Sequence, residues 1–259
     1  MTSQPAVANS QLPADPGAAP APGLVSKPKT AEMNPGPGFR IRRNEIRPEP
    51  ALLQGFAAFT TPDISDIMNR LYTMVTEIRQ QTDPDRSLLG PACTVKVFPG
   101  DNLMVHKALD LVQPGDIMVI DAGASPMNAV LGDLITTKAR HRGVAGIVVD
   151  GLVRDIEGIV ETGVPVFARG VTPIGPLHRG PGEINYAIQC GGIVVHPGDI
   201  VIGDRNGVVI VPLEAADDVL QQLRARRAGE AQYLAAVQRG EFSNAWVDKL
   251  LTEARCNSV

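Results

Sequence analysis

The sequence predicts a mixed α/β fold in which alternating strands and helices are followed by an all-β stretch and then by C-terminal helices. Short apolar runs alternate with helical segments between residues 92 and 170. Within "GGIVVHPGDIVIGDRNGVVIVP", residues 191–212, Pro-Gly-Asp and Asn-Gly separate three apolar runs. After Pro212 the pattern is helical. We therefore predict a single α/β domain over residues 39–259.

The first 38 residues differ in composition from the rest of the chain. The stretch "SQLPADPGAAPAPGLVSKPKTAEMNPGPG" is rich in Pro, Ala, Gly and Ser and has no apolar period. Such a segment cannot bury enough apolar surface to offset the entropy lost on ordering. We predict a disordered tail over residues 1–38. It lacks the continuous apolar segment of a secretory signal.

Composition excludes several classes of partner. The formal net charge of the 259 residues is -4, so the chain has no overall basic footprint for nucleic acid. No apolar run approaches the roughly 18 residues that indicate a membrane helix. The three cysteines, Cys93, Cys190 and Cys256, show no C-x-x-C spacing. This usage argues against a disulfide framework or a zinc site and favours a reducing compartment, so we expect a cytoplasmic protein.

Residues 52–74 are expected to form two helical pieces. In the second piece, Thr61 or Asp63 can act as the N-cap, and Pro62 stands at an early helical position, where proline is tolerated. The apolar residues predicted to share one face of this helix are Ile64, Ile67, Met68 and Leu71.

Apolar runs and turn residues predict four strands and three helices in the alternating region, residues 92–170. The predicted strands are residues 92–100, 116–123, 144–151 and 164–170, and the predicted helices are residues 102–115, 129–143 and 155–163. The second of these helices ends in Arg-His-Arg-Gly, which suits the negative end of a helix dipole and its C-cap. Asn206-Gly207 predicts a hairpin, and residues 213–240 and 244–254 predict the C-terminal helices.

The first candidate functional feature is "LGDLI", residues 131–135. If Gly132 precedes a new helix, the free amides of Asp133, Leu134 and Ile135 form an anion site. The alternative is that Gly132 allows close packing inside one continuous helix.

The second feature is the pair Arg154–Asp155, which follows an apolar run. Open α/β sheets gather ligand-binding residues at the carboxyl ends of their strands. Two structural alternatives stay open: Asp155 can cap the following helix, and Arg154 can pair with Glu157 or Asp150 on the surface.

Asp133 and Asp155 lie one strand apart in the predicted order. The connection between them can bring two neighbouring strand ends together, so both carboxylates can share one divalent cation. Hard oxygen ligands with open positions suit Mg²⁺ or Mn²⁺.

Asp133, twenty further residues and then Arg154-Asp155 resemble the D-x20-R-D signature of the RraA-like family. The blocks "PGDIMVIDAG", "LGDLITTKARHRGVAGIVVDGLVRD" and "VHPGDIVIGDRNGVVIVP" are also similar, and the resemblance spans roughly residues 50 to 235. It implies the swivelling β/β/α fold, with flanking N- and C-terminal helices. It also implies assembly as a homotrimer or homohexamer with the site between subunits.

The family includes class II, metal-dependent pyruvate aldolases that act on 4-hydroxy-4-methyl-2-oxoglutarate and 4-carboxy-4-hydroxy-2-oxoadipate. The resemblance implies that a 2-oxo acid chelates Mg²⁺ or Mn²⁺ bound by Asp155, while the amides after Gly132 hold its carboxylate. Arg154 would stabilise the enolate oxygen, and Asp133 would orient a water for proton transfer. Glu230 would supply a metal contact from a neighbouring subunit. Decarboxylation of oxaloacetate passes through the same pyruvate enolate and is the expected second activity.

The chain departs from the aldolase pattern at one position. Aldolases of the family carry an acid three residues after the Asp of the Arg-Asp pair, where this chain has Gly158; the nearest acid is Glu157. One helical position rotates a side chain by about 100°. The departure favours the family's other branch, non-catalytic regulators that bind a ribonuclease, whereas the additional terminal helices are like those of the aldolases. A family lyase for another 2-oxo acid is the third possibility.

Overall fold

The computed structural model describes residues 32–43 and 45–256. The chain divides into two units, Met1–Gly36 and Pro37–Val259, and the account below concerns the second. Most of the predicted tail, residues 1–31, lies outside the described residues.

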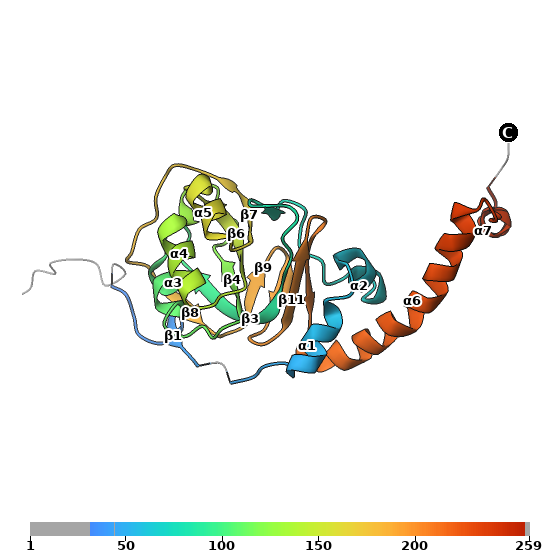
Figure 1. Ribbon diagram of the computed structural model, residues 1–259. Helices are drawn as coiled ribbons and strands as arrows, with labels where there is room; N and C mark the ends of the chain where they lie inside the picture. The colour runs from blue at the N-terminus through green and yellow to red at the C-terminus, as the bar shows by residue number, and fades with distance from the viewer. Residues whose placement is uncertain (1–31, 44, 257–259) are drawn as a thin grey trace, which may run out of the picture. The chain divides into compact units, whose positions relative to one another are not determined.

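The second unit contains the predicted alternation of strands and helices (Figure 1). The strands are β1 (Phe39–Ile41), β2 (Arg79–Gln80), β3 (Leu88–Val97), β4 (Ile117–Asp121), β5 (Ala129–Leu131), β6 (Gly146–Val153), β7 (Val166–Val171), β8 (Gly182–Ile184), β9 (Ile188–Cys190), β10 (Ile193–Val195), β11 (Ile200–Asp204) and β12 (Gly207–Val211). The helices are α1 (Pro50–Phe56), α2 (Thr61–Ile67), α3 (Leu103–Ala108), α4 (Asp133–His141), α5 (Ile156–Thr162), the 3-10 helix η2 (Leu213–Ala215), α6 (Ala216–Gln238) and α7 (Ala245–Glu253).

The centre of the unit is a parallel arrangement of β3, β4, β6 and β7, which neighbour one another in that order. β5 adds to β6, also in parallel. Every residue of β4 is buried. This is expected for a strand that is covered on both faces and has a nearly continuous apolar sequence. Parallel strands place their carboxyl ends on one edge, so the residues that follow β5 and β6 become neighbours.

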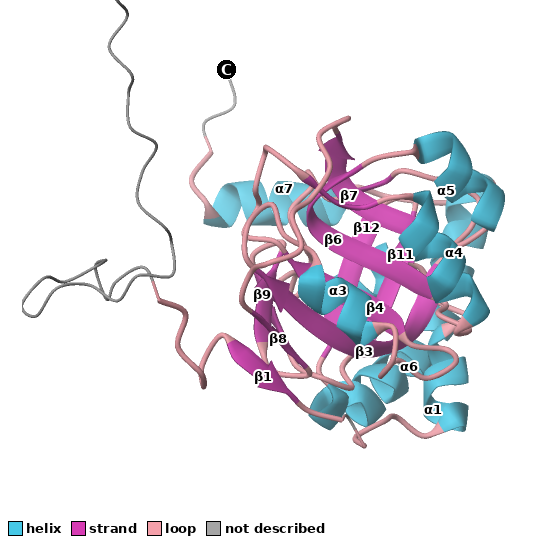
Figure 2. Cartoon of the chain, turned by 90° about the vertical axis from the view of Figure 1, so that its left-hand side faces the viewer, coloured by secondary structure: helices cyan, strands magenta, loops and turns pink. Residues whose placement is uncertain are grey.

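Three apolar clusters separate the layers of the fold. On β4, Met118 and Ile120 belong to the cluster shared with α3, α4 and α5, which cover one face of the sheet (Figure 2). Ile117 and Val119 point the other way, into a cluster shared with β9 to β12. A third cluster joins β11 and β12 to α1, α2 and α6. This confirms the predicted α/β class and places an all-β layer between two helical ones.

The N-cap predicted for α2 was wrong by one residue. Thr60 is the cap: its hydroxyl accepts from the backbone of Asp63, whose side chain accepts from the backbone of Thr60. The helix stops at Ile67, with Asn69 and Arg70 at positive φ, so Leu71 leaves the predicted apolar face and is 71% exposed.

The hairpin predicted at Asn206-Gly207 is confirmed, because β11 and β12 pair antiparallel across it. The apolar run before this hairpin, which forms β10, pairs with a different strand. β10 joins β9 in a separate two-stranded sheet, whereas β11 also pairs with β3. Strands β1, β2, β8 and β9 were not predicted; each has only two or three residues, too few to show a period.

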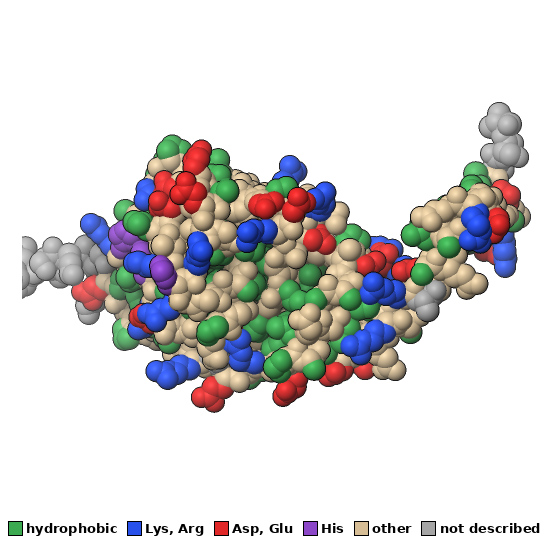
Figure 3. Space-filling model, in the orientation of Figure 1, with side chains coloured by type: hydrophobic (Ala, Val, Ile, Leu, Met, Phe, Trp, Pro, Cys, Tyr) green, Lys and Arg blue, Asp and Glu red, His purple; other side chains and the backbone are tan. Residues whose placement is uncertain are grey.

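Charge is dispersed over the face drawn in Figure 3, where basic and acidic side chains are interspersed. Within the described residues, no helix combines the length and the apolar character that a membrane span requires.

Candidate active site at the ends of β5 and β6

Gly132 marks the start of a new helix. β5 ends at Leu131, Gly132 is an extended N-cap with φ -145° and ψ -160°, and α4 begins at Asp133. The side chain of Thr136 donates back to the carbonyls of Gly132 and Asp133, at 3.2 and 2.9 Å, and fixes this turn. The predicted helix start is therefore confirmed. The predicted helix over residues 129–143 was too long, because its first three residues are a strand.

One of the three amides predicted for an anion is already engaged. The amide of Leu134 donates to Oδ1 of Asp133 at 2.6 Å. Asp133 is the first residue of the helix and not its cap, and its carboxylate stands where the positive end of the helix dipole favours negative charge. An incoming carboxylate has to displace this contact before it can use the Leu134 amide. The Ile135 side chain is buried and anchors the turn in the core.

The ends of β5 and β6 lie side by side, although β5 was predicted as part of a helix. Leu131 pairs with Val153, and the amide of Arg154 donates to the Leu131 carbonyl at 3.1 Å. Arg154 and Asp155 therefore stand beside the N-terminus of α4. Their proximity comes from parallel pairing between segments that are about twenty residues apart in the chain.

Asp155 occupies the N-cap position of α5 without using its side chain as a cap. Its backbone is left-handed, with φ 56° and ψ 48°, a conformation that costs free energy in a non-glycine residue. Its Oδ2 lies 3.2 Å from Nε of Arg154, and the two side chains are 42% and 39% exposed. Asp150, the rival partner for Arg154, is buried and pairs with Arg169. The conformation turns the Asp155 carboxylate towards Arg154 rather than onto its own helix.

Two glycines set how closely these acids are packed. A Cβ on Gly132 would lie 2.3 Å from Oδ2 of Asp155, and a Cβ on Gly158 would lie 2.7 Å from Cβ of Asp133. Real side chains do not approach so closely, so both positions need glycine in this arrangement. The departure at position 158 thus has a physical reason here: any side chain there would push against Asp133.

A cleft of about 390 Å³ opens beside Asp133, between α4 and α5. On α4 it is lined by residues three and four positions apart, which share one helix face. The lining residues are Asp133, Thr137, Arg140, His141, Gly158, Glu161 and Thr162. The cleft connects one of the predicted site acids to the basic end of α4.

The loop that follows β7 also reaches the site, and the sequence did not predict it. A Cβ on Gly175 would lie 2.6 Å from Nη1 of Arg154, so this loop passes close to the guanidinium. The Pro and Gly residues of "TPIGPLHRG", residues 172–180, predict an irregular loop. The sequence does not indicate which side chain this loop approaches.

The residues suited to a divalent cation are the carboxylates of Asp133 and Asp155. Both flank the turn at Gly132, where the missing Cβ leaves room beside the Asp155 oxygen. No group of three or more His, Cys, Asp or Glu side chains in the described part of the chain is placed to hold a metal. A divalent cation held by these two carboxylates therefore stays a prediction; Mg²⁺, which keeps much of its water shell, is the ion that so few protein ligands would suit.

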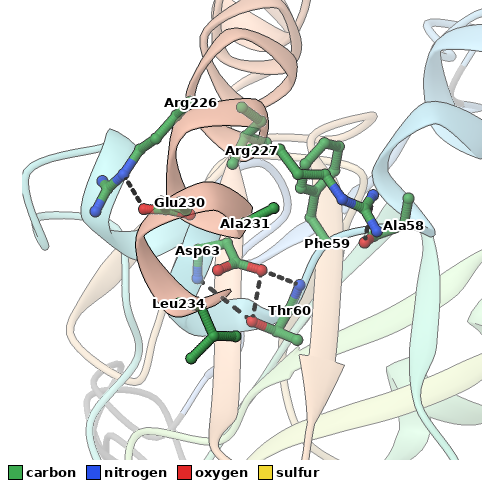
Figure 4. Close-up of a pocket in the computed structure, with 10 residues that line it drawn as sticks. Ala58, Phe59, Thr60, Asp63, Arg226, Arg227, Glu230, Ala231 and Leu234 are labelled. Carbon is green, nitrogen blue, oxygen red and sulfur yellow. Dashed lines mark hydrogen bonds and ion pairs between the residues drawn. The ribbon is translucent and has the colours of Figure 1, made fainter. Parts of the chain in front are cut away.

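Glu230 does not join this site within one chain. It lies on α6, forms an ion pair with Arg226, and lines another pocket of about 380 Å³ beside residues 58–63 (Figure 4). None of the residues around that pocket belongs to the Asp133–Asp155 site. A contact from Glu230 to the metal of a neighbouring subunit stays a prediction.

The profile of the RraA-like family, described as Aldolase/RraA, matches residues 61–210. The chain belongs to the RraA-like family. The matched region contains Gly132, Asp133 and the Arg154–Asp155 pair, so the resemblance inferred from the sequence is confirmed.

Aldolase names and RNase-inhibitor names both occur among the similar proteins. A protein of Halalkalibacterium halodurans named "Putative 4-hydroxy-4-methyl-2-oxoglutarate aldolase" is 36% identical over 197 residues, 76% of this chain and 93% of the relative. The Streptomyces coelicolor protein RraAS2, titled an unusual member of the RNase ES inhibitor RraA protein family, has a TM-score of 0.66 at 26% identity. That alignment covers 74% of this chain and 100% of RraAS2. The RNA-processing inhibitor RraA of Thermus thermophilis has a TM-score of 0.55 at 30% identity, covering 60% and 93%.

Proposed function

We propose that the protein is a divalent-metal-dependent lyase that cleaves a 4-hydroxy-2-oxo diacid to pyruvate by a retro-aldol reaction and also decarboxylates oxaloacetate. One observation carries the proposal: a guanidinium and two carboxylates, on Arg154, Asp155 and Asp133, gather at the paired ends of β5 and β6 beside a helix N-terminus. The aldolase names of the relatives support it.

The chain's own residues would bind and orient the substrate. The amides at the start of α4, on Asp133, Leu134 and Ile135, would receive the substrate carboxylate once Asp133 releases the Leu134 amide. The guanidinium of Arg154 would donate to the 2-oxo oxygen, where negative charge develops as the C3–C4 bond breaks. Asp133, once the Leu134 amide no longer donates to it, would then accept or return a proton through a water.

Mg²⁺ or Mn²⁺ is the proposed cofactor, with Asp155 as its direct ligand. A bound divalent ion supplies Lewis-acid polarisation of the 2-oxo group and stabilises the enolate charge. Asp155 suits this task because its carboxylate is half-exposed and is not used as a helix cap.

We further propose that the chain works as a homotrimer or homohexamer on a small 2-oxo acid in the cytoplasm, without a nucleic-acid or membrane partner. Exposed apolar side chains surround the Arg154 region and would be covered by a neighbouring subunit. They include Met127, Leu134, Val171, Ile174 and Leu177. In such an assembly, Glu230 of another copy would be the added metal contact.

Turnover tests the proposal directly. Purified protein with Mg²⁺ or Mn²⁺ should release pyruvate from oxaloacetate or from a 4-hydroxy-2-oxo diacid, and EDTA should abolish the release. Asp155→Ala should be inactive, and Arg154→Ala should turn over about 10²-fold more slowly, as loss of an oxyanion donor does. Glu157→Ala is the matched control, because Glu157 is an exposed acid two positions after Asp155. Metal-independent release would refute the mechanism.

A second function is favoured by Gly158, which replaces the acid expected of aldolases. We propose as the alternative a regulator that binds a ribonuclease without catalysis, the role named in the titles of RraA structures. The same preparation separates the two: turnover on any 2-oxo acid supports the lyase. No turnover across a panel of 2-oxo acids, together with stoichiometric binding to a ribonuclease, supports the regulator. Turnover confined to another 2-oxo acid would identify a different lyase.

A further inference from the structure

The Arg154 side chain passes close to two glycines, one beside its aliphatic part and one beside its guanidinium. A Cβ on Gly132 would lie 3.1 Å from Cγ of Arg154, and a Cβ on Gly175 would lie 2.6 Å from Nη1 and 3.4 Å from Cζ. The stem of the arginine therefore passes one glycine and its charged end passes the other. Oδ2 of Asp155 lies 3.2 Å from Nε of the same side chain.

Gly175 belongs to the loop between β7 and β8, residues 172–181, which we term the strap. The side chain of Asn128 donates to the Gly175 carbonyl at 2.7 Å, and the amide of Ala129 donates to the Ile174 carbonyl at 2.8 Å. Asn128 also lies against Gly100, whose own carbonyl accepts from the amide of Leu177 at 2.8 Å. The strap is thus attached on both sides of Gly175.

A second attachment secures the far end of the strap. Buried Asp101 accepts from the amides of Arg179 and Gly180 through Oδ2, at 2.6 and 2.8 Å. Buried Asn102 donates to the Val130 carbonyl, so its oxygen faces Nδ1 of His178 at 2.6 Å. With this end fixed, and with backbone bonds at Ile174 and Leu177, the Asn128 side chain supplies the one attachment at Gly175 itself, the strap residue next to the guanidinium.

We propose that Asn128 and Gly175 are positioning residues that set the place of the Arg154 guanidinium. The inference rests on the proposed function, because it assigns Arg154 the role of oxyanion donor. Asn128 binds the strap at Gly175, and Gly175, which has no Cβ, leaves the guanidinium the space that a side chain would take. Neither residue touches the reacting atoms; both act through Arg154.

The geometry yields a clean perturbation with a matched control. Gly175 lies outside the left-handed region, so Gly175→Ala meets no backbone strain and adds one methyl against the mobile end of Arg154. The guanidinium must retreat by nearly 1 Å to restore an ordinary contact. Gly170→Ala, also outside that region, adds the same methyl only 3.5 Å from Cδ2 of Leu152, an ordinary contact. Asn128→Ala removes the bond to the strap.

Two measurements test the inference. The first is the rate at which phenylglyoxal modifies Arg154, followed by peptide mass spectrometry, which needs no enzymatic activity. Gly175→Ala and Asn128→Ala should each raise this rate several-fold, whereas Gly170→Ala should leave it unchanged. Unchanged rates in both variants, with unchanged melting temperatures, would overturn the inference even if the wild-type protein proves to be a lyase.

The second measurement is pyruvate release. Gly175→Ala and Asn128→Ala should lower kcat by about 10-fold or more, as small misplacements of a reacting group do. On an Arg154→Ala background they should cause no further fall, whereas a merely structural role would lower activity on either background. A faster-modified Arg154 with wild-type kcat would overturn the catalytic part. If the wild-type protein has no turnover, the proposed function fails, and the labelling alone decides whether Asn128 and Gly175 position the guanidinium.

Discussion

Replacing Gly132 with alanine adds a single methyl group at the point where α4 meets the Arg154–Asp155 pair. The backbone there is extended, with φ -145°, so alanine can adopt it without strain. The new Cβ would stand 2.3 Å from Oδ2 of Asp155. Most of the perturbation therefore falls on the side chain that we propose as the metal ligand, with a smaller part on Cγ of Arg154 at 3.1 Å.

The size of the effect follows from the distances. An ordinary contact begins near 3.4 Å, so the Asp155 oxygen must move by about 1 Å. Because the carboxylate is 42% exposed, it can rotate into solvent, and the cost in stability should be about 1 kcal/mol, at the low end of overpacking. The rotation also breaks the pair with Arg154, which at this exposure contributes less than about 1 kcal/mol. Function should suffer far more than stability, by about 10²-fold in turnover.

The assay combines oxaloacetate turnover at saturating Mn²⁺ with Mn²⁺ affinity measured by electron paramagnetic resonance and with the free energy of unfolding in urea. Gly229→Ala on α6 is the control, since nothing lies within 4 Å of a Cβ there. We expect weak Mn²⁺ binding and slow turnover in the Gly132 variant. The control should keep wild-type Mn²⁺ binding and turnover, and its free energy of unfolding should rise by up to about 1 kcal/mol, because alanine favours the helix interior. Unchanged Mn²⁺ affinity together with unchanged kcat would refute the assignment of Asp155 to the metal.

Three further predictions concern packing, pH and thiol reactivity. Gly158→Glu should lower the free energy of unfolding by about 1–3 kcal/mol in urea titrations, because the new Cβ would lie 2.7 Å from Cβ of Asp133. A variant as stable as the wild type, with faster turnover, would show instead that α5 can shift to accommodate the side chain. The hydrogen bond from Arg40 lowers the pKa of Glu183, so its stabilisation is present above the ordinary value of 4.5 and is lost as pH falls through the lowered folded-state pKa. Acid titrations should therefore show less loss of unfolding free energy in Glu183→Gln, and an identical pH profile would contradict this. Burial raises the pKa of the Cys93 and Cys190 thiols, whereas Cys256 is exposed. The native protein should therefore react with one equivalent of a disulfide reagent, at Cys256. Reaction with three equivalents before denaturation would contradict the burial of Cys93 and Cys190.

The sequence indicated the central elements because their patterns are local. Near-continuous apolar letters marked β4 and β6, and Asn206-Gly207 marked the turn between β11 and β12. The dipole-matched end of α4 was also readable, with Gly143 at positive φ directly after it. Where a segment was too short to carry a period, prediction failed: β5 has three residues and was assigned to the following helix.

The residues of the candidate site also fall into two groups, those that the sequence predicted and those that it did not. Its charged members could be named from spacing and family resemblance, since Asp133 and the Arg154–Asp155 pair stand at recognisable positions. The neighbours that limit their movement could not, because Gly158, Gly175 and Asn128 reach them through packing between separate elements. Loops rich in Pro and Gly indicate that the chain turns, but they do not indicate which residues the turn contacts.

By itself, the sequence determined the α/β class, the order of the main elements, the family and the acidic and basic side chains of the site, because these depend on local periodicity and on residue identity. Only the tertiary structure decided that Oδ2 of Asp155 lies against Gly132, that Gly158 lies against Asp133, and that the strap passes close to Arg154. The reason is that such contacts join residues far apart in the chain, and their distances are fixed by how parallel strands and their covering helices pack, which no single segment encodes.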